Sequence, residues 1–543
     1  MKLMNTISVK AQQWRAVDIS LKTDKAYRSP FEDVDVFGTF CGPDGRTIKL
    51  LAFWNGNGTW VLRFAPTVVG QWRFTVESTD KNPDFNQSGS VECVPYTGEL
   101  DMYRHGFLQA SESRDYLEHA DRTPFFWLGD THWTFVTEEK FNESNCLQYD
   151  SQFKACVDKR VAQKFTVYQC NFRDGIGVGG FGRSIDLMQE TPEGFIPNLE
   201  EFQNNVDPKM KYLADCGLLI AVGYAWGYDM AKNSLKRYKK LAKYTAARYG
   251  AYPVAWTLAG ELPGYGPGQE ENIRDWGEVA RECKKWNVYN NLQSVHLACA
   301  RPFPKIYENE PWFDFAMSQA GHGDFDMGQT MYAQFKEMYK GHPILESEGA
   351  YEGAASGEYT SRIISAAMMR RLAYLIMQSG GCGYTYGCNG VWELQWEAGV
   401  GGIGWGDMAW WDGLNLPGAD QLTIFRDFYE SVGWSKLKPL PESQAGATPV
   451  FMEITNRTQI FFIGDKEMKT VVGYISETSM QGFTIKGLTA TAYKMWWMDP
   501  ETGERTEEKA LACPVNGVFE YTPEMRFGSR KDKLVVLQAV KNI

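Results

Sequence analysis

Apolar and polar positions alternate in short segments at both ends of the chain. In residues 1–97 the segments VDVFGTF, TWVLRFAP and QWRFTVES show this alternation, and the turn sequences GPDGR and NGNG separate them. Short alternating segments broken by turns are typical of an antiparallel sandwich. The pattern returns in residues 440–543, in FMEITNRTQIFFIG, TVVGYIS and YKMWWMDPETGE. The sequence therefore predicts one β-sandwich domain at each end.

The middle region, residues 105–435, alternates strand-like apolar runs with helical stretches such as TSRIISAAMMRRLAYLIMQ. The strand-like runs are PFFWLGD, FTVYQCNF, LLIAVGYAW, VAWTLAG, LQSVHLA, FDFAMSQ, HPILESE and GCGYTYG. Eight repeats predict an α/β fold, a (β/α)8 TIM barrel with insertions. A doubly wound sheet would also alternate, but polar residues end nearly every run, which favours the barrel. Because the linkers are short, we expect both β-sandwich domains to pack on the barrel through apolar and aromatic surface.

Two carboxylates are the main candidates for chemistry. Alternation along VAWTLAGE places Glu261 on the face of the small residues, which suits a crowded barrel interior. Alternation along HPILESE places Glu346 and Glu348 on one inward face, with Glu346 about 7 Å deeper. Glu352 lies beyond Gly349, at the rim. The sequence thus predicts that Glu261 and Glu348 face each other across the barrel mouth, and that Glu346 has a structural or supporting role.

A pair of carboxylates in a barrel mouth is typical of glycoside hydrolysis. One carboxyl group must be protonated to assist the leaving group, while the other must be ionised, as nucleophile or as base for water. The alternative is a pair of buried structural carboxylates, satisfied by arginine or backbone donors. The position at the carboxyl ends of strands, where barrel enzymes keep their sites, favours catalysis.

Other polar and aromatic residues are expected at the same end of the barrel. Taken singly, each is as well explained as a loop or core residue, but together they predict an aromatic-walled site for hydroxyl groups. The predicted substrate-binding residues are Asp130, His132, Trp133, Asn171, Arg173, Asp174, Tyr224, Trp226, His296, Gln319, His322, Tyr351 and Trp392.

Composition narrows the possible partners and the compartment. The net charge of −11 argues against nucleic acid or an anionic membrane surface as partner, and no apolar run is long enough to span a membrane. The N-terminus lacks the apolar run of a signal peptide, and the eleven scattered cysteines indicate reduced thiols, so we expect a cytoplasmic protein. The aromatic content of 14% is high enough to supply surfaces that stack on a ligand.

Neither a metal nor a cofactor is expected. The chain has six histidines, no HExxH motif and no paired CxxC motifs, so no metal site is indicated. The sequences at 175–180 and 399–404 match GxGxxG, but neither opens a helix in a nucleotide-binding unit. We interpret both as glycine-rich substrate loops.

Several of these segments resemble a known family. PFFWLGDTHW, VAWTLAGE, FDFAMSQAGH and PILESEGAYE resemble the apiosidase-like barrel enzymes, glycoside hydrolase family 140 and its relatives. The first and last regions resemble the β-domains that often flank those barrels. The resemblance implies that Glu261 is the acid/base and Glu348 the nucleophile. Two positions depart from the family: Glu261 stands where apiosidase relatives carry Asp, and Gly260 where many retaining barrel glycosidases carry Asn.

These observations predict a cytoplasmic, retaining glycoside hydrolase that acts on a carbohydrate substrate. We expect exo action on short oligosaccharides or small glycosides, since long polymers do not enter cells. One alternative is an endo-acting, cellulase-like barrel glycosidase, which would need an open groove. Another is a carbohydrate-binding protein without activity, against which the presence of both Glu261 and Glu348 argues.

Overall fold

Parallel strands form the centre of the molecule. The computed structural model describes residues 7–174, 185–231, 234–264, 267–299, 301–322, 341–355, 363–395, 406–449, 460–476, 481–506, 510–522 and 531–540. The central sheet has the order β17-β16-β13-β12-β20-β19-β18. Its strands are β12 (Trp127–His132), β13 (Val167–Asn171), β16 (Leu219–Trp226), β17 (Val254–Gly260), β18 (Ala316–Ser318), β19 (Ile344–Glu346) and β20 (Gly383–Tyr386).

The extended segment 293–296 closes this sheet into a barrel. It is bridged to β17 through Trp256 and Gln293, and to β18 through His296 and Met317. The amide of His296 donates to Ala259 O at 3.0 Å, and the amide of Ser294 donates to Trp256 O at 2.9 Å. With this segment the described residues supply eight strand positions, one for each predicted run. The fold is therefore α/β with a TIM-like barrel.

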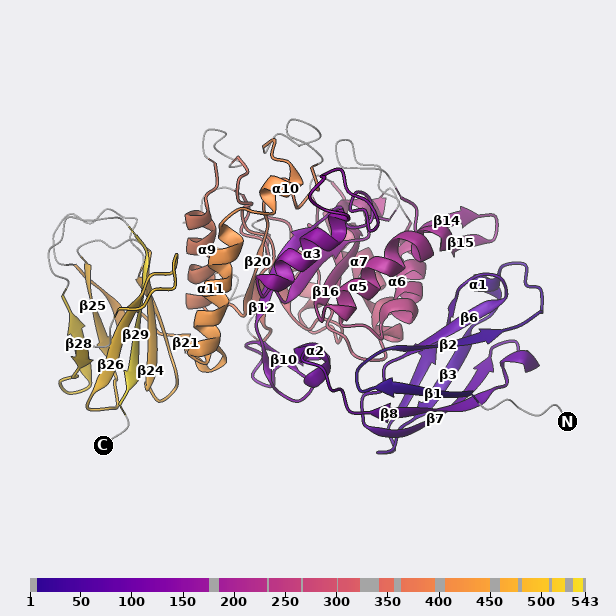
Figure 1. Ribbon diagram of the computed structural model, residues 1–543, viewed down its shortest axis with the longest axis horizontal. Coiled ribbons are helices and arrows are strands. Elements are labelled where there is room, and N and C mark those ends of the chain that lie inside the picture. Colours follow the sequence, from indigo (N-terminus) through magenta and orange to yellow (C-terminus); the bar gives the residue numbers. More distant parts are fainter. Residues whose placement is uncertain are drawn as a thin grey trace.

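Helices cover the outside of the barrel, as Figure 1 shows. They are α3 (Gln152–Ala162), α5 (Asp207–Asp215), α6 (Leu235–Tyr249), α7 (Gln269–Trp286), α9 (Ala366–Gln378) and α11 (Gly418–Ser431). Serine side chains cap three of them: Ser151, Ser234 and Ser365 each accept a hydrogen bond from the amide three residues ahead. The short helix α10 (Trp410–Gly413) lies at the end of the barrel where the strands end (Figure 1). No helix within the described residues is long and apolar enough to cross a membrane.

Two sheets form the N-terminal region, with the orders β1-β8-β7-β3-β4 and β2-β6-β5. Side chains such as Phe40, Trp60, Phe64 and Trp72 form a buried core of its own here. The elements are β1 (Ile7–Gln12), β2 (Val17–Lys22), α1 (Pro30–Asp33), β3 (Val36–Cys41), β4 (Thr47–Leu51), β5 (Phe53–Trp54), β6 (Thr59–Phe64), β7 (Gly70–Ser78) and β8 (Ser88–Val94).

The C-terminal region also consists of two sheets, with the orders β21-β23-β24-β29-β26-β27 and β22-β25-β28. Phe462, Phe483 and Tyr493 belong to its buried core. The strands are β21 (Lys438–Pro439), β22 (Ala445–Pro449), β23 (Ile460–Gly464), β24 (Thr470–Ile475), β25 (Gln481–Lys486), β26 (Tyr493–Met498), β27 (Ala510–Ala512), β28 (Val518–Tyr521) and β29 (Lys533–Ala539).

Smaller elements complete the middle of the chain. At the base of the barrel in Figure 1 lie α2 (Asp101–Arg104) and the sheet of β9 (Leu108–Ala110), β10 (Leu117–His119) and β11 (Pro124–Phe125). The hairpin β14 (Met188–Thr191) and β15 (Gly194–Pro197) precedes α4 (Leu199–Glu201).

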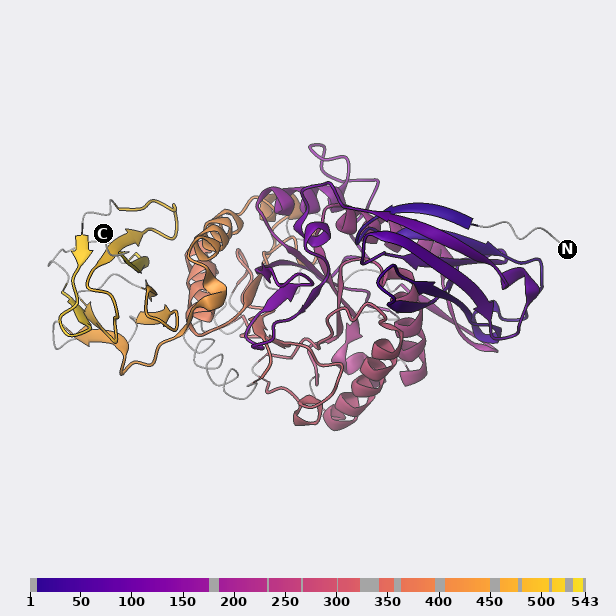
Figure 2. The ribbon, with the colours of Figure 1, turned by 90° about the horizontal axis from the view of Figure 1, so that it is seen from below.

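Both β-regions pack against the barrel, which lies between them in Figure 2. Phe31 and Phe53 of the N-terminal region and Tyr474 of the C-terminal region belong to the same buried apolar cluster as the barrel core. Tyr474 stacks on Tyr374 of α9 with the ring centroids 5.0 Å apart. Polar contacts add to this packing: Arg370 of α9 holds both carboxylate oxygens of Asp532, at 2.9 and 2.7 Å. The expected packing through apolar and aromatic surface is confirmed.

Candidate active site

Glu348 lies just past β19 at the barrel mouth and is enclosed by polar neighbours. Its side chain is almost wholly buried, and the residue is only 5% exposed. The hydroxyl of Tyr351 donates a hydrogen bond to Oε1. His296 Nε2 lies 3.1 Å from Oε2, and His322 Nε2 lies 3.4 Å from Oε1. The neighbours come from three places: the segment that closes the barrel, the residues after β18, and the residues after β19.

These neighbours keep Glu348 ionised. Burial alone would raise the pKa of the Glu348 carboxyl, but the His296 and His322 rings outweigh burial and hold that pKa well below its usual range. The pKa of Tyr351 moves the other way: burial, and then the Glu348 charge, raise it well above its ordinary value. Tyr351 therefore keeps its proton and remains a donor to an anionic Glu348.

Glu261 approaches the same neighbours from the opposite side of the barrel. Its amide donates to His296 Nδ1 at 3.3 Å. Because Nδ1 accepts this bond, a neutral His296 carries its proton on Nε2, the nitrogen that faces Glu348. The Glu261 charge is also among the causes that raise the pKa of Tyr351. His296 thus contacts the backbone of Glu261 and the carboxylate of Glu348, and Tyr351 lies near both residues.

The alternation predicted along β17 is wrong beyond Trp256. The register passes from Val222 opposite Trp256 to Gly223 opposite Leu258, so Thr257 is an extra residue in a β-bulge. Leu258 has a positive φ of 51°, and Glu261, which follows the strand, has a φ of 49°. This left-handed backbone, not simple alternation, sets the direction in which Glu261 leaves the strand.

An aromatic cluster lies beside Glu348. It comprises Trp133, Tyr351, Ala354 and Trp392, with the partly buried Trp226 packed against it. Trp133 Nε1 donates to the Tyr351 hydroxyl at 2.9 Å, and the Tyr351 and Trp392 rings stack with centroids 5.1 Å apart. The Trp226 and Trp133 rings meet edge to face, with their centroids 5.1 Å apart. These predicted residues therefore do come together with Glu348.

Trp226 also explains the glycine that precedes Glu261. A Cβ atom added to Gly260 would lie 2.0 Å from the Trp226 ring, far inside van der Waals contact. The Trp226 ring occupies the space in which the Asn that many retaining barrel glycosidases carry at this position would start. Gly260 and Trp226 therefore depend on each other sterically.

Glu346 does not point into the barrel as the alternation predicted. It pairs with Tyr384, whose hydroxyl lies on the side of α9: a Cβ atom added to Gly349 would contact both this hydroxyl and Leu372 of α9. Paired residues of parallel strands share a face. Ser318 Oγ donates to Oε2 of Glu346 at 2.9 Å, and the Ala320 amide donates to Oε1 at 2.7 Å. Since β19 ends at Glu346, alternation gives no guide to Glu348.

We expect Glu346→Gln to reduce kcat/KM less than about tenfold, far less than Glu348→Gln. Burial raises the pKa of Glu346 to about 8, so its neutral form prevails near pH 7 and an amide changes little there. Steady-state kinetics of the two variants on one aryl glycoside measure the difference. A larger loss in Glu346→Gln than in Glu348→Gln would contradict the assignment of the two residues.

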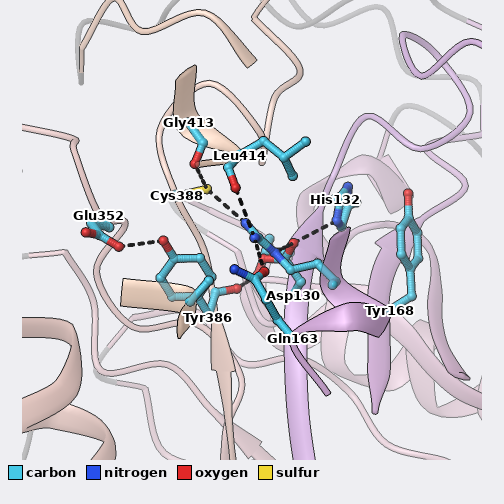
Figure 3. A network of polar contacts seen from close by, with 12 residues as sticks. Asp130, His132, Gln163, Tyr168, Glu352, Tyr386, Cys388, Gly413 and Leu414 are labelled. Carbon is cyan, nitrogen blue, oxygen red and sulfur yellow. Dashed lines mark hydrogen bonds and ion pairs between the residues drawn. The ribbon is translucent and has the colours of Figure 1, made fainter. Parts of the chain in front are cut away.

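Asp130 and His132 belong to a buried polar network on the helix side of β12 (Figure 3). Asp130 accepts from Arg160 Nε of α3 at 2.6 Å and lies 3.0 Å from His132 Nε2. His132 Nδ1 lies 2.9 Å from Glu139, which also accepts from Tyr168 at 2.6 Å. Both ring nitrogens of His132 are engaged by carboxylates, so neither is available to a sugar hydroxyl. The contacts give this pair a structural role.

Asp174 and Tyr224 are also engaged away from Glu348. Asp174 binds Arg237 through both oxygens and accepts from the amides of Leu187 and Met188. The Tyr224 hydroxyl donates to Cys283 Sγ of α7 at 3.4 Å, so this side chain faces the helices. The structure thus corrects the prediction that Tyr224 lines the mouth.

Three predicted residues remain near strand ends without a contact to Glu348. Asn171 donates to Ala225 O at 3.1 Å and accepts from the Arg173 amide at 2.8 Å. Arg173 and Gln319 are buried. Substrate contact by these residues stays a prediction. The GxGxxG sequences at 175–180 and 399–404 lie outside the described residues.

The sequence reasoning missed two carboxylates, Glu139 and Glu393. Glu139 lies in the segment after β12, seven residues past His132, with which it forms an ion pair. Glu393 follows Trp392 in the turn after β20, and its position past a strand end was the signal that could have found it. Among the described residues no group of three or more His, Cys, Asp or Glu side chains could hold a metal ion.

Comparison with known proteins identifies the class. The sequence matches the family described as the apiosidase-like catalytic domain over residues 111–436, more than half of the chain. The family match and the TIM-like barrel together identify the protein as a glycoside hydrolase. The chain belongs to the apiosidase-like family. Residues 10–79 match a second family, a domain of unknown function named DUF5060.

Solved structures support the fold over nearly the whole chain. A putative glycoside hydrolase from Bacteroides vulgatus ATCC 8482 is 16% identical, with a TM-score of 0.70, and the match covers 98% of this chain and 100% of that one. A protein named glycoside hydrolase is 20% identical, with a TM-score of 0.66 and coverage of 82% and 99%. A glycoside hydrolase family 5 protein, also from Bacteroides vulgatus ATCC 8482, is 18% identical, with a TM-score of 0.65 and coverage of 82% and 95%. No curated protein matches the sequence.

Proposed function

We propose that this glycoside hydrolase uses a retaining, two-carboxylate mechanism, with Glu348 as nucleophile and Glu261 as acid/base. The observation that carries the proposal is the enclosure of Glu348 by Tyr351, His296 and His322, which keeps it anionic despite burial. A nucleophile must be charged before the substrate arrives, whereas a general acid must not. Glu348 therefore suits the first role, and Glu261, which follows β17 at the same end of the barrel, is assigned the second.

The reaction follows from these roles. Protonated Glu261 gives its proton to the glycosidic oxygen as the bond to the anomeric carbon breaks. Glu348 Oε attacks that carbon from the opposite face and forms a glycosyl ester. Glu261, now ionised, takes a proton from water, and the resulting hydroxide oxygen displaces Glu348. Two inversions at the anomeric carbon give net retention.

His296 and Tyr351 serve as positioning residues in this scheme. The Nε2 proton of His296 and the Tyr351 hydroxyl proton both face Glu348, so they orient its oxygens and stabilise the charge that returns when the ester is hydrolysed. His296 Nδ1 also accepts from the Glu261 amide, so the same ring contacts the backbone of one proposed catalytic residue and the side chain of the other.

The enclosure of Glu348 supports exo action on short oligosaccharides or small glycosides. A carboxylate that is 5% exposed beside a cluster of aromatic rings favours a terminal sugar over an internal unit of a polymer. The finer fold belongs to the same proposal: the N-terminal and C-terminal sheet pairs are β-sandwich domains, with boundaries at 1–97 and 440–543. Within the described residues none of the eleven cysteines forms a disulfide, which supports a cytoplasmic location.

A panel of p-nitrophenyl glycosides, run beside carboxymethylcellulose, tests the exo assignment. We expect at least one glycoside to release p-nitrophenol and the viscosity of the polymer solution to stay constant. An exo enzyme removes end units and leaves the chain length nearly unchanged, whereas an endo enzyme lowers viscosity at once. A rapid fall in viscosity would favour the endo-acting alternative.

A further inference from the structure

The turn that follows β20 is fixed beside the aromatic cluster. Trp392 belongs to that cluster, and its carbonyl accepts from the Trp133 amide at 2.9 Å. The Gln395 amide donates to Gly390 O at 2.7 Å, and Gln395 O accepts from the Trp410 amide at 2.9 Å. The turn 391–395 is therefore held between the loop after β12 and α10, at the same end of the barrel as Glu348.

Two polar side chains of this turn are buried with unmatched atoms. Glu393 is 8% exposed and Gln395 is 3% exposed. Glu393 Oε2, Gln395 Oε1 and Gln395 Nε2 are enclosed and have no hydrogen-bond partner among the described residues. Burying a polar group without a partner costs stability, so such groups are uncommon unless another role retains them.

Other buried carboxylates of this barrel have donors. Glu352 Oε2 accepts from the Tyr386 hydroxyl at 2.6 Å and from the Gly418 amide at 2.9 Å. Glu346 accepts from Ser318 and Ala320. Glu393 differs from both: burial, the one influence on its ionisation, raises its pKa to about 7. No structural bond within the described chain accounts for Glu393.

The proposed nucleophile and its histidine neighbour also carry enclosed polar atoms that make no hydrogen bond within the described part of the chain. By hydrogen-bond geometry Glu348 Oε2 and His296 Nε2 are unmatched too, although they lie 3.1 Å apart. Unmatched, enclosed polar atoms therefore occur at the proposed nucleophile and again in the turn 391–395. The Trp392 ring lies in this turn and stacks on Tyr351, which in turn donates to Glu348.

We propose that Glu393 and Gln395 form a sugar-binding subsite, in which they hold a pair of neighbouring hydroxyl groups of a neutral sugar. The inference rests on the proposed function and deepens it. A carboxylate accepts hydrogen bonds from hydroxyl groups, and a carboxamide both accepts and donates, so together the two side chains match a vicinal diol. The adjacent Trp392 supplies an apolar face, as sugar sites commonly require. The subsite selects among glycosides by their hydroxyl pattern.

Substitution of Glu393 tests the subsite because binding and stability should change in opposite directions. For the p-nitrophenyl glycoside that the wild type hydrolyses best, we expect Glu393→Leu to raise KM about tenfold, the effect of one or two lost hydrogen bonds. The expected kcat stays within about threefold, since Glu393 does not touch Glu348. The melting temperature should stay equal or rise, because an unmatched buried carboxylate is removed. Gln395→Leu should act in the same direction and serves if Glu393→Leu does not fold.

The matched control is Glu352→Gln, which alters a buried carboxylate that has donors. We expect it to lower the melting temperature and leave KM unchanged. A Glu393→Leu protein with a lower melting temperature and an unchanged KM would overturn the subsite and make Glu393 structural. If Glu348→Gln is inactive while Glu393→Leu keeps the wild-type KM, the subsite alone fails. If Glu348→Gln keeps full activity, the proposed function fails instead.

Discussion

Replacing Glu348 with Gln is expected to reduce kcat by at least about 10⁴-fold, the scale seen when a covalent nucleophile is removed. The amide has nearly the same shape and can still accept from Tyr351, but it carries no charge to attack the anomeric carbon. KM should change little, because the polar contacts around Glu348 are mostly preserved. Initial rates on an aryl glycoside, with enzyme concentrations high enough to detect residual turnover, measure the loss.

The fold of the Glu348→Gln protein must be intact for this result to count. Circular dichroism and the melting temperature provide that check, and Glu346→Gln is the matched kinetic control, since Glu346 lies two residues earlier and is also buried.

The stability of the Glu348→Gln protein should also depend on pH differently from that of the wild type. Because the pKa of Glu348 is depressed in the folded state, its contribution to stability is present above the unfolded pKa and is lost as pH falls through the folded value. The stability of Glu348→Gln should therefore fall less steeply than that of the wild type as the pH drops. A loss of kcat below tenfold would remove Glu348 as nucleophile.

Replacing Glu261 with Ala is expected to separate the two steps of the reaction. A p-nitrophenolate leaving group needs little protonation, so the first step should persist and release a burst of about one equivalent of p-nitrophenol. The second step needs a base for water and should slow by a factor on the order of 10² to 10⁴. The backbone contact of Glu261 to His296 is unaffected by the substitution, so the surroundings of Glu348 are retained.

Azide gives the sharper result for Glu261→Ala. It is a nucleophile that needs no base, and we expect it to restore turnover by about 10² and to yield a glycosyl azide of retained configuration. In Glu348→Ala the same anion would instead attack in place of the missing carboxylate and give the inverted azide. An inverted azide from Glu261→Ala would exchange the roles of the two residues, and no rescue in either variant would contradict both assignments.

The strands of the barrel could be predicted because they are apolar on both faces. Each of the eight runs matches a strand position, including the run LQSVHLA, which closes the barrel through isolated bridges at Gln293 and His296. A parallel sheet covered by helices leaves this signal in any sequence. The lengths of the strands were less predictable: β19 has only three residues, so the alternation applied to HPILESE ended too early to orient Glu348.

The site was only partly predictable, for two physical reasons. First, a β-bulge at Thr257 and the left-handed backbone at Leu258 and Glu261 break the alternation along β17. Glycine often marks such positions in a sequence, but none of these three residues is a glycine. Second, some of the polar residues at strand ends face the helices. Asp130 and Tyr224 are such residues, since Asp130 meets Arg160 of α3 and Tyr224 meets Cys283 of α7.

Strand alternation does hold along β12 once the direction of one residue is known from the structure. Gly129 packs against the Thr385 side chain inside the barrel, so the next residue, Asp130, must face out. The contacts of Glu348 with His296 and His322 lay beyond any such rule, because they join residues that are 52 and 26 positions apart. Only the closed barrel brings them together.

The stereochemistry of hydrolysis decides whether Glu348 acts as a nucleophile. Proton NMR of the sugar that the wild-type protein releases, recorded before mutarotation, shows which anomer forms first. We expect the anomer of the substrate, because Glu348 forms a covalent intermediate that water displaces by a second inversion. The opposite anomer as first product would contradict it and would turn Glu348 from a nucleophile into a base for water.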